Sequence, residues 1–322
     1  MIMKNFFRKI YSSYANSNHL IVILSVIVLV LVAIIVFIEV VDKSSSNRIV
    51  ISPTFLTDPS RQFYQADDLI INLQPLRDEL GNLEKNPNAS VYFEALNTGA
   101  NISINKDAEF FPASLLKVPL VIAVVKKIER GEWKWNMEIA LKEADKNKNF
   151  GTLWQQPAGT LFTVEELVKQ TIINSDDTSY FMLLNNIDPN EIAEVQNYLG
   201  LYDFISNDLE ISAKKYAPIL RSLFSATYLT VEDSEKVLNW MSESNFNDYL
   251  AEGMPPATKF SHKIGVEDTK KIYLDAGIVY LPNRPYILIV MVKNYDAEHA
   301  SAIMRDISQR VYKYMSDYPK NI

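Results

Sequence analysis

Ser114 and Lys117 are the residues whose types and spacing best suit covalent chemistry. They lie in the segment Phe-Pro-Ala-Ser-Leu-Leu-Lys-Val-Pro-Leu (111–120), and an almost wholly apolar run continues to Val125. In a helix the two side chains share one face. Burial would lower the pKa of the lysine, so that its amine could accept the serine proton, and free N–H groups at a helix start would help stabilise an oxyanion. Taken alone, the pair is more typical of a helix cap beside an exposed lysine.

Two further motifs follow in the same chain. Ser175-Asp176-Asp177 precedes an apolar run, and Lys263-Ile264-Gly265 precedes the last strands. Alone, the first indicates a capped helix start and the second a polar strand end. Together and in this order, the three motifs resemble the Ser-x-x-Lys, Ser-Asp-Asn and Lys-Thr-Gly signature of serine β-lactamases and penicillin-binding proteins. The resemblance is greatest to class A β-lactamases and related serine hydrolases, and it covers roughly residues 66–318.

The resemblance implies a role for each matching residue. Ser114 would attack an acyl carbon and become the acyl-enzyme, with Lys117 as the proton acceptor. Ser175 would relay a proton to the leaving nitrogen. Lys263 would supply positive charge for a substrate carboxylate and hold Ser175. The backbone N–H groups of Ser114 and Val266 would form the oxyanion hole, and β-lactams or acyl-D-Ala-D-Ala peptidoglycan stems would be the substrates.

Three residues of the substrate-binding region extend or break this pattern. Gly265 matches the signature and would let a substrate lie close to the strand. Asp177 stands where the signature has Asn, and an ionised Asp only accepts hydrogen bonds. It could hold Lys117 or Lys263, would keep that lysine charged, and would repel an acidic substrate. Ile264 replaces a hydroxyl residue, and losing such a contact to a charged group costs about 1.5–3 kcal/mol.

The loop expected between the second and third motifs is the other departure. Class A enzymes deacylate with a glutamate and a downstream asparagine there, whereas residues 199–212 look shortened. Asp208 and Glu210 are the acids near the right place, and neither is followed by the family's pattern. We therefore expect an acyl-enzyme at Ser114 to hydrolyse slowly.

The N-terminal region carries one long apolar segment. Residues 20–38 contain no charged side chain and, with adjoining residues, can span the roughly 30 Å core of a bilayer as a helix. A buried core helix and a cleaved signal peptide are the alternatives, but the sequence after residue 38 fits a cleavage site poorly. Basic residues before the segment favour a cytoplasmic N-terminus. We expect a plasma-membrane protein with a cytoplasmic segment at 1–18, a transmembrane helix at 19–41, a stalk at 42–65 and an outer domain at 66–322.

The spacing of apolar residues predicts an α+β fold for the outer domain. Leucines recur every three or four residues from Leu69 to Leu83, as on one face of a helix. Strands are expected at 90–96, 100–104, 271–280 and 286–293, with mostly helical sequence between 113 and 245 and a last helix near the C-terminus. Thr163 and Glu166 form a capping-box pattern. The order favours an antiparallel sheet flanked by helices plus an all-helical part, and the resemblance implies a β-lactamase/transpeptidase-like fold.

Composition excludes several other classes of function. The chain has 322 residues, no cysteine, three histidines and a net charge of −7. A thiol nucleophile is excluded, a His-rich metal site has little support, and no basic stripe indicates nucleic-acid binding. We expect no metal and no cofactor. His262 adjoins Lys263 on a strand, so its side chain should point to the opposite face, away from Ser114.

Two classes of function remain from the sequence. The first is a membrane-anchored bacterial serine acyl-hydrolase. The second is a cell-wall binding or regulatory domain that keeps the fold with little or no turnover, which the departures at Asp177 and Ile264 motivate. A hydrolase for some other ester or amide stays open, because Ile264 makes the pocket less polar.

Overall fold

A computed structural model of the chain describes residues 71–201 and 210–318. The chain divides into two compact units, Met1–Thr54 and Phe55–Ile322, and every described residue belongs to the second. The transmembrane helix and stalk expected at 19–41 and 42–65 lie outside the described residues. Within the described ranges, no helix is both long enough and apolar enough to cross a membrane.

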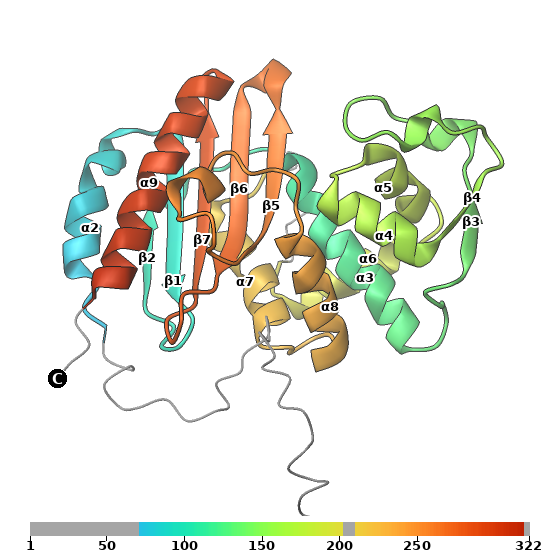
Figure 1. Ribbon diagram of the computed structural model, residues 1–322, viewed down its shortest axis with the longest axis horizontal. Coiled ribbons are helices and arrows are strands. Elements are labelled where there is room, and N and C mark those ends of the chain that lie inside the picture. The colour runs from blue at the N-terminus through green and yellow to red at the C-terminus, as the bar shows by residue number, and fades with distance from the viewer. Residues whose placement is uncertain (1–70, 202–209, 319–322) are drawn as a thin grey trace, which may run out of the picture. The chain divides into compact units, whose positions relative to one another are not determined.

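A five-stranded antiparallel sheet forms the centre of the described domain (Figure 1). Its strand order is β2-β1-β7-β6-β5. The strands are β1 (Ala89–Ala95), β2 (Asn101–Ile104), β5 (Phe260–Glu267), β6 (Ile272–Val279) and β7 (Tyr286–Lys293). The strands expected at 90–96 and 100–104 are confirmed, and they form a hairpin in which Val91 lies opposite Ile104. Strand β1 also pairs with β7, so residues from both ends of the domain share one sheet.

The first and last helices of the domain pack together on one face of this sheet (Figure 1). They are α2 (Gln74–Leu80), which a 3₁₀ turn at Gly81–Lys85 extends, and α9 (Ala297–Asp317). Their apolar side chains join every second residue of the strands in one buried cluster, which includes Leu76, Val290 and Ile307. The period-two alternation of strands therefore sends this set of side chains towards α2 and α9.

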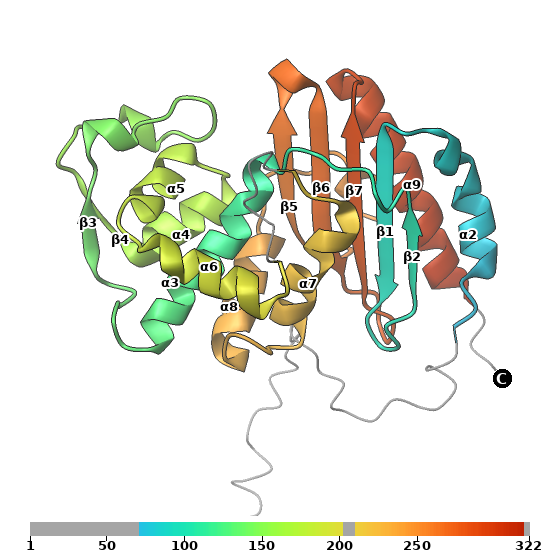
Figure 2. The ribbon, with the colours of Figure 1, turned by 180° about the vertical axis from the view of Figure 1, so that it is seen from behind.

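The opposite face of the sheet meets the helical part of the domain (Figure 2). Helices α7 (Ala213–Phe224) and α8 (Val231–Ser242) contact the sheet directly, α7 at β1 and β7 and α8 at β5. Beyond them lie α3 (Lys117–Glu129), α4 (Val164–Ile173), α5 (Asp177–Leu184) and α6 (Pro189–Tyr198), with a small sheet of β3 (Glu138–Ala140) and β4 (Leu161–Thr163). Short 3₁₀ helices occupy Ala113–Leu116, Glu143–Asp145, Leu153–Gln155, Ala251–Gly253 and Asp268–Lys270.

The structure confirms two predictions made from the sequence, the fold class and the capping box. The α+β class with an antiparallel sheet, flanking helices and a helical part is confirmed. The capping box is confirmed as well: Thr163 accepts from the backbone of Glu166 at the start of α4, and Glu166 accepts from the backbone of Thr163. These hydrogen bonds satisfy backbone N–H groups that would otherwise be free at the start of the helix, and so they fix where α4 begins.

Candidate active site

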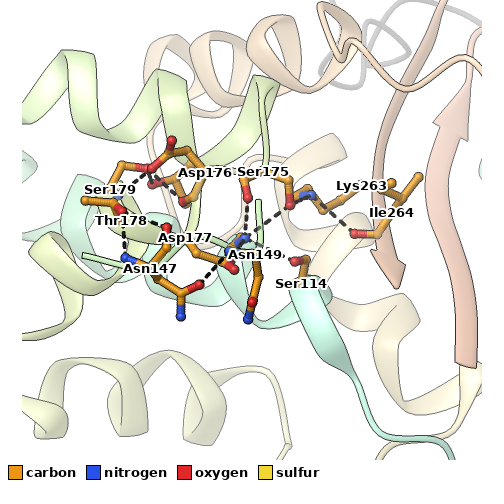
Figure 3. Close-up of polar contacts among 12 residues, drawn as sticks. Ser114, Asn147, Asn149, Ser175, Asp176, Asp177, Thr178, Ser179, Lys263 and Ile264 are labelled. Atoms are coloured by element: carbon orange, nitrogen blue, oxygen red, sulfur yellow. Dashed lines mark hydrogen bonds and ion pairs between the residues drawn. The ribbon is translucent and has the colours of Figure 1, made fainter. Parts of the chain in front are cut away.

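Residues of all three motifs meet where the sheet borders the helical part of the domain (Figure 3). Ser114 lies in the 3₁₀ helix Ala113–Leu116, and Lys117 begins α3 directly after it. Ser175 lies in the link before α5, and Lys263 lies on the edge strand β5. Four side chains from three separate segments of the sequence thus form one hydrogen-bonded cluster.

The amine of Lys117 is the centre of this cluster. Its Nζ atom lies 3.1 Å from Oγ of Ser114, 3.1 Å from Oγ of Ser175 and 2.6 Å from the carbonyl oxygen of Ser175. It also lies 2.6 Å from Oδ1 of Asp177 in an ion pair. The base candidate therefore touches the nucleophile candidate, the second serine and the carboxylate that replaces the signature's asparagine.

Lys263 approaches the same serine from the other side. Its Nζ atom lies 2.7 Å from Oγ of Ser175 and 3.2 Å from the carbonyl oxygen of Ile264. The ring centroid of Phe246 lies 5.7 Å away, within range of a cation–π contact. The Phe246 ring in turn packs edge-on against Phe150. Ser175 is therefore held between two amines, with aromatic rings next to Lys263.

Burial weakens the proton affinity of both lysines. It lowers the pKa of Lys117, while the nearby carboxylates of Asp177 and Asp176 act in the opposite direction. For Lys263, burial and the charge of Lys117 together hold the pKa well below its usual range, and Asp275 and Asp177 oppose them. An amine with a lowered pKa can exist in the neutral form that accepts a proton, which is the form a general base needs.

The backbone is strained at two points of this site. Ala113, directly before Ser114, has a φ of 47°, and Ser175 itself has a φ of 51°. Such left-handed conformations are uncommon for residues other than glycine and cost free energy, which the surrounding packing must offset. Strain of this kind gathers at functional sites, and here it sets the directions of both serines.

Asp176 is a site residue that sequence reasoning did not assign. Its side chain is fully buried, and Oδ1 accepts from the backbone N–H of Ser179 as the N-cap of α5. Its Oδ2 accepts from the N–H groups of Thr152 and Leu153 at 2.7 and 3.0 Å. Asp176 therefore ties the loop before α4 to the turn that carries Ser175. Its position before a helical run indicates an N-cap residue. No local sequence pattern indicates its contact with residues 152 and 153.

Residues 147–150 also border the site, although the sequence did not predict a role for them there. Asn147 exchanges hydrogen bonds with the hydroxyl of Thr178, and the N–H of Asp177 donates to the carbonyl oxygen of Phe150 at 3.0 Å. The N–H of Asn149 donates to Oδ1 of Asn147 at 2.9 Å, and Figure 3 draws both residues with the motif residues. No short motif marks these residues, because they reach the site through tertiary packing alone.

Gly265 lies where strand β5 passes closest to the nucleophile segment. A Cβ atom at this position would meet the carbonyl oxygen of Pro112 at 2.9 Å and the side chains of Leu274 and Leu115 at 3.2 and 3.3 Å. The missing side chain lets β5 approach the turn that carries Ser114. Val266, whose N–H was expected in the oxyanion hole, follows directly on the same strand.

Ile264 and His262 belong to the other face of β5. Ile264 is buried and joins the apolar cluster under α2 and α9 rather than the cluster next to Ser114. His262 follows the same alternation: its Nδ1 lies 2.9 Å from Oδ1 of Asp275, and its ring stacks on Phe260. Neither makes a hydrogen bond to the serines within the described part of the chain.

The segment expected to carry a hydrolytic base is described only in part. Residues 202–209, which include Asp208, lie outside the described residues. Glu210 is exposed, and the next residue, Ile211, forms a backbone bridge with Phe110 shortly before the nucleophile. Among the described residues, no group of His, Cys, Asp or Glu is arranged to hold a metal ion.

Comparisons with known proteins agree with this geometry. The β-lactamase enzyme family matches residues 75–315 of the chain. β-Lactamase VEB-1 of Pseudomonas aeruginosa is 23% identical over 283 residues, which cover 78% of this chain and 91% of that protein.

Solved structures share the fold. The structure of PBP-A has a TM-score of 0.68 at 24% identity, with 76% of this chain and 97% of that chain covered. A mutant of PBP-A, with the same TM-score and identity, has been solved as an acyl-enzyme complex with penicillin G. A β-lactamase of Sphaerobacter thermophilus has a TM-score of 0.70 at 21% identity, covering 77% and 100%. The chain therefore belongs to the β-lactamase enzyme family, within the group of serine β-lactamases and penicillin-binding proteins.

Proposed function

We propose that Ser114 is a nucleophile that forms an acyl-enzyme with β-lactams or with acyl-D-Ala-D-Ala ends of peptidoglycan stems. The observation that carries the proposal is the hydrogen bond of 3.1 Å between Nζ of Lys117 and Oγ of Ser114. The mutant of PBP-A captured with penicillin G adds support, because it has the same fold and reacts with a β-lactam.

The contacts around Lys117 suggest a path for the proton during acylation. Oγ of Ser114 attacks the acyl carbon, and its proton passes to neutral Lys117. When the bond from the acyl carbon to nitrogen breaks, the hydroxyl of Ser175 donates a proton to the leaving nitrogen and recovers one from Lys117, 3.1 Å away. Lys263 holds Ser175 and supplies positive charge. The N–H groups of Ser114 and Val266 are the proposed oxyanion donors.

Release of the acyl group is proposed to be slow. The sequence from 199 to 212 lacks the family's pattern for a deacylating glutamate, and its described acid, Glu210, is exposed. A hydrolytic water needs a base within hydrogen-bond reach. The protein would then accumulate as the acyl-enzyme, as expected of a penicillin-binding protein rather than an efficient antibiotic-destroying enzyme.

The location of the domain is proposed from the sequence alone. The uncharged apolar segment at 20–38 and the basic residues before it support a single membrane span with the N-terminus in the cytoplasm. A stalk at 42–65 would then carry the domain on the outer side of the plasma membrane, where peptidoglycan stems are found.

The test is to incubate the full-length protein with a fluorescent penicillin and follow the covalent adduct over time. Wild type is expected to gain one label per chain and lose it slowly after excess probe is removed. Ser114→Ala should gain none. An unlabelled wild type at high dose, or equal labelling of Ser114→Ala, would contradict the proposal.

A second candidate is a cell-wall binding or regulatory domain with little turnover. The ion pair of Lys117 with Asp177 favours it, because this departure changes the charge next to Ser114 and not the fold. Binding of peptidoglycan fragments with equal affinity to wild type and Ser114→Ala, with no adduct, would support this candidate over the first. Labelling by a non-lactam ester or amide probe, with none by penicillin, would indicate a different substrate class.

A further inference from the structure

Asp177 and Lys117 form an ion pair that is nearly closed to solvent. The distance from Nζ of Lys117 to Oδ1 of Asp177 is 2.6 Å, and the two side chains are only 3% and 16% exposed. A pair this close and this buried is weakly screened by salt, so the charge of Asp177 acts on Lys117 at almost full strength. The family signature has a neutral asparagine at this position, so this charge is a property of the present chain.

The hydrogen bonds around Lys117 show what each protonation state can do. Four oxygen atoms surround its Nζ, and two of them, the carbonyl of Ser175 and the carboxylate of Asp177, can only accept. A neutral amine gives its two N–H bonds to these acceptors and turns its lone pair to the hydroxyls of Ser114 and Ser175. An ammonium has a third N–H, which then points to a serine oxygen and blocks transfer of the Ser114 proton.

We propose that Asp177 is the counter-ion that keeps Lys117 protonated in the resting protein, and that it thereby sets the pH range in which Ser114 is acylated. The consequence at Ser114 rests on the proposed function. Asp177 acts through Lys117 and is therefore a positioning residue. Acylation then rises with pH as the pair loses its proton, and it rises at higher pH than a neutral residue at position 177 would allow.

Other charged or titratable groups face Lys117 from the elements packed around it. At α5 these are the N-cap residue Asp176, whose carboxylate is bound by three backbone N–H groups, and Tyr180, whose ring centroid lies 5.8 Å from Nζ. On β5 the group is Lys263, across Ser175. Within the described residues, Asp177 is the carboxylate in direct contact with Lys117, so its replacement changes the charge balance most.

The sign of the effect follows from the charges. The Asp177 carboxylate raises the pKa of Lys117 against the lowering effect of burial. Asp177→Asn keeps an oxygen that can accept from Lys117 but removes the negative charge, so the amine loses its proton at lower pH. An opposite charge this close favours the protonated amine, so the midpoint of acylation against pH should move down when that charge is removed.

The experiment measures the rate of Ser114 acylation by fluorescent penicillin from about pH 5 to about pH 10, near the ordinary pKa of lysine, for three proteins. Wild type and Asp177→Glu, which keeps the charge, should share a midpoint, and Asp177→Asn should have a lower one. Equal midpoints in wild type and Asp177→Asn would overturn the inference. A change in midpoint that Asp177→Glu reproduces would also overturn it, since the charge would not be the cause.

A second measurement separates this inference from the proposed function. The ¹³Cε signal of Lys117 in the full-length protein, identified by its loss in Lys117→Arg, reports the protonation of the amine without any substrate. A lower titration midpoint in Asp177→Asn supports the counter-ion, and an unchanged one overturns it, even if no variant reacts with penicillin. Absence of labelling in wild type at every pH would instead contradict the proposed function.

Discussion

Lys263 and Ser175 lie 88 positions apart in the chain, yet Nζ of Lys263 is 2.7 Å from Oγ of Ser175. Because Lys117 contacts the same hydroxyl, two buried amines share one serine. The charge of Lys117 opposes the charging of Lys263, and burial opposes the charging of both. The site is therefore organised for proton transfer at a cost in stability, as is common where function requires polar groups in a buried place.

Lys263→Met should make the folded domain more stable at neutral pH. Burial holds the pKa of Lys263 well below its usual range, so the unfolded chain binds more protons than the folded one between that lowered pKa and about 10.4. Wild-type stability should thus rise with pH across this interval. Methionine removes the buried amine and the cost of burying its charge, so Lys263→Met should be more stable than wild type at neutral pH.

Denaturant unfolding of the full-length protein at a series of pH values checks this prediction. The difference between Lys263→Met and wild type should shrink as the pH rises towards about 10.4, because the lysine of the unfolded chain then begins to lose its proton as well. Lys313→Met, at an exposed position of α9, is the matched control and should follow wild type. A gain that stays constant with pH would show that packing, and not the charge of Lys263, is responsible.

Gly151→Ala should disturb the hydrogen bonds of Asp176, which hold the Ser175-Asp176-Asp177 motif in place. Gly151 has a φ of +81°, and a Cβ atom there would lie 1.9 Å from Oδ2 of Asp176. The left-handed backbone costs about 1–2 kcal/mol with alanine. The clash adds about 1–3 kcal/mol, because Asp176 is fully buried and bound on both oxygens. Acylation of Ser114 should also slow, since Asp176 adjoins Ser175.

Gly159→Ala is the control for this change. Gly159 has a φ of +91° and nothing within 4 Å of its Cβ position, so it carries the backbone cost without the clash. Chemical denaturation and the labelling rate should be measured for both variants. If the two lose the same stability and keep the same labelling rate, Asp176 does not position the motif.

Much of the framework could be predicted from local patterns. The strands expected at 90–96 and 286–293 and the capping box at Thr163 rest on local signals, and each is present in the structure. The three motifs could be placed because their order is itself a pattern. Their convergence then follows from the fold, since strand β5 and the turn before α5 meet at the nucleophile.

The contacts that tune the site could not be predicted in the same way. Asp176 reaches the backbone of Thr152 and Leu153, and Phe246 reaches Lys263, through packing between distant segments. The position of Ile264 shows a second limit. Alternation says that Ile264 and Lys263 face opposite sides of β5, but only the assembled sheet shows that the Ile264 side faces the apolar cluster under α9. Nor does sequence reveal the left-handed backbone at Ala113 and Ser175, which no glycine marks.

Gly265→Ala should impair acylation more than it impairs folding. The added methyl group would meet the carbonyl oxygen of Pro112 at 2.9 Å and the side chains of Leu274 and Leu115, which are parts of the structure that cannot easily move. We expect β5 to shift away from the turn of Ser114, at a cost of about 1–3 kcal/mol in stability. The same shift would separate the N–H groups of Ser114 and Val266, and losing one oxyanion donor slows acyl transfer about 100-fold or more.

The measurements for Gly265→Ala are the penicillin acylation rate at saturating probe and the unfolding midpoint, both on the full-length protein. Gly81→Ala, at a helical position with nothing within 4 Å of its Cβ site, should leave both nearly unchanged. If Gly265→Ala acylates at the wild-type rate, the close approach of β5 to Pro112 is not needed for the chemistry. A loss of rate that scales only with the fraction unfolded would assign Gly265 to folding instead. A large loss of rate in a well-folded variant is the expected result, because the proposed oxyanion donors lie on the two segments that Gly265 lets approach.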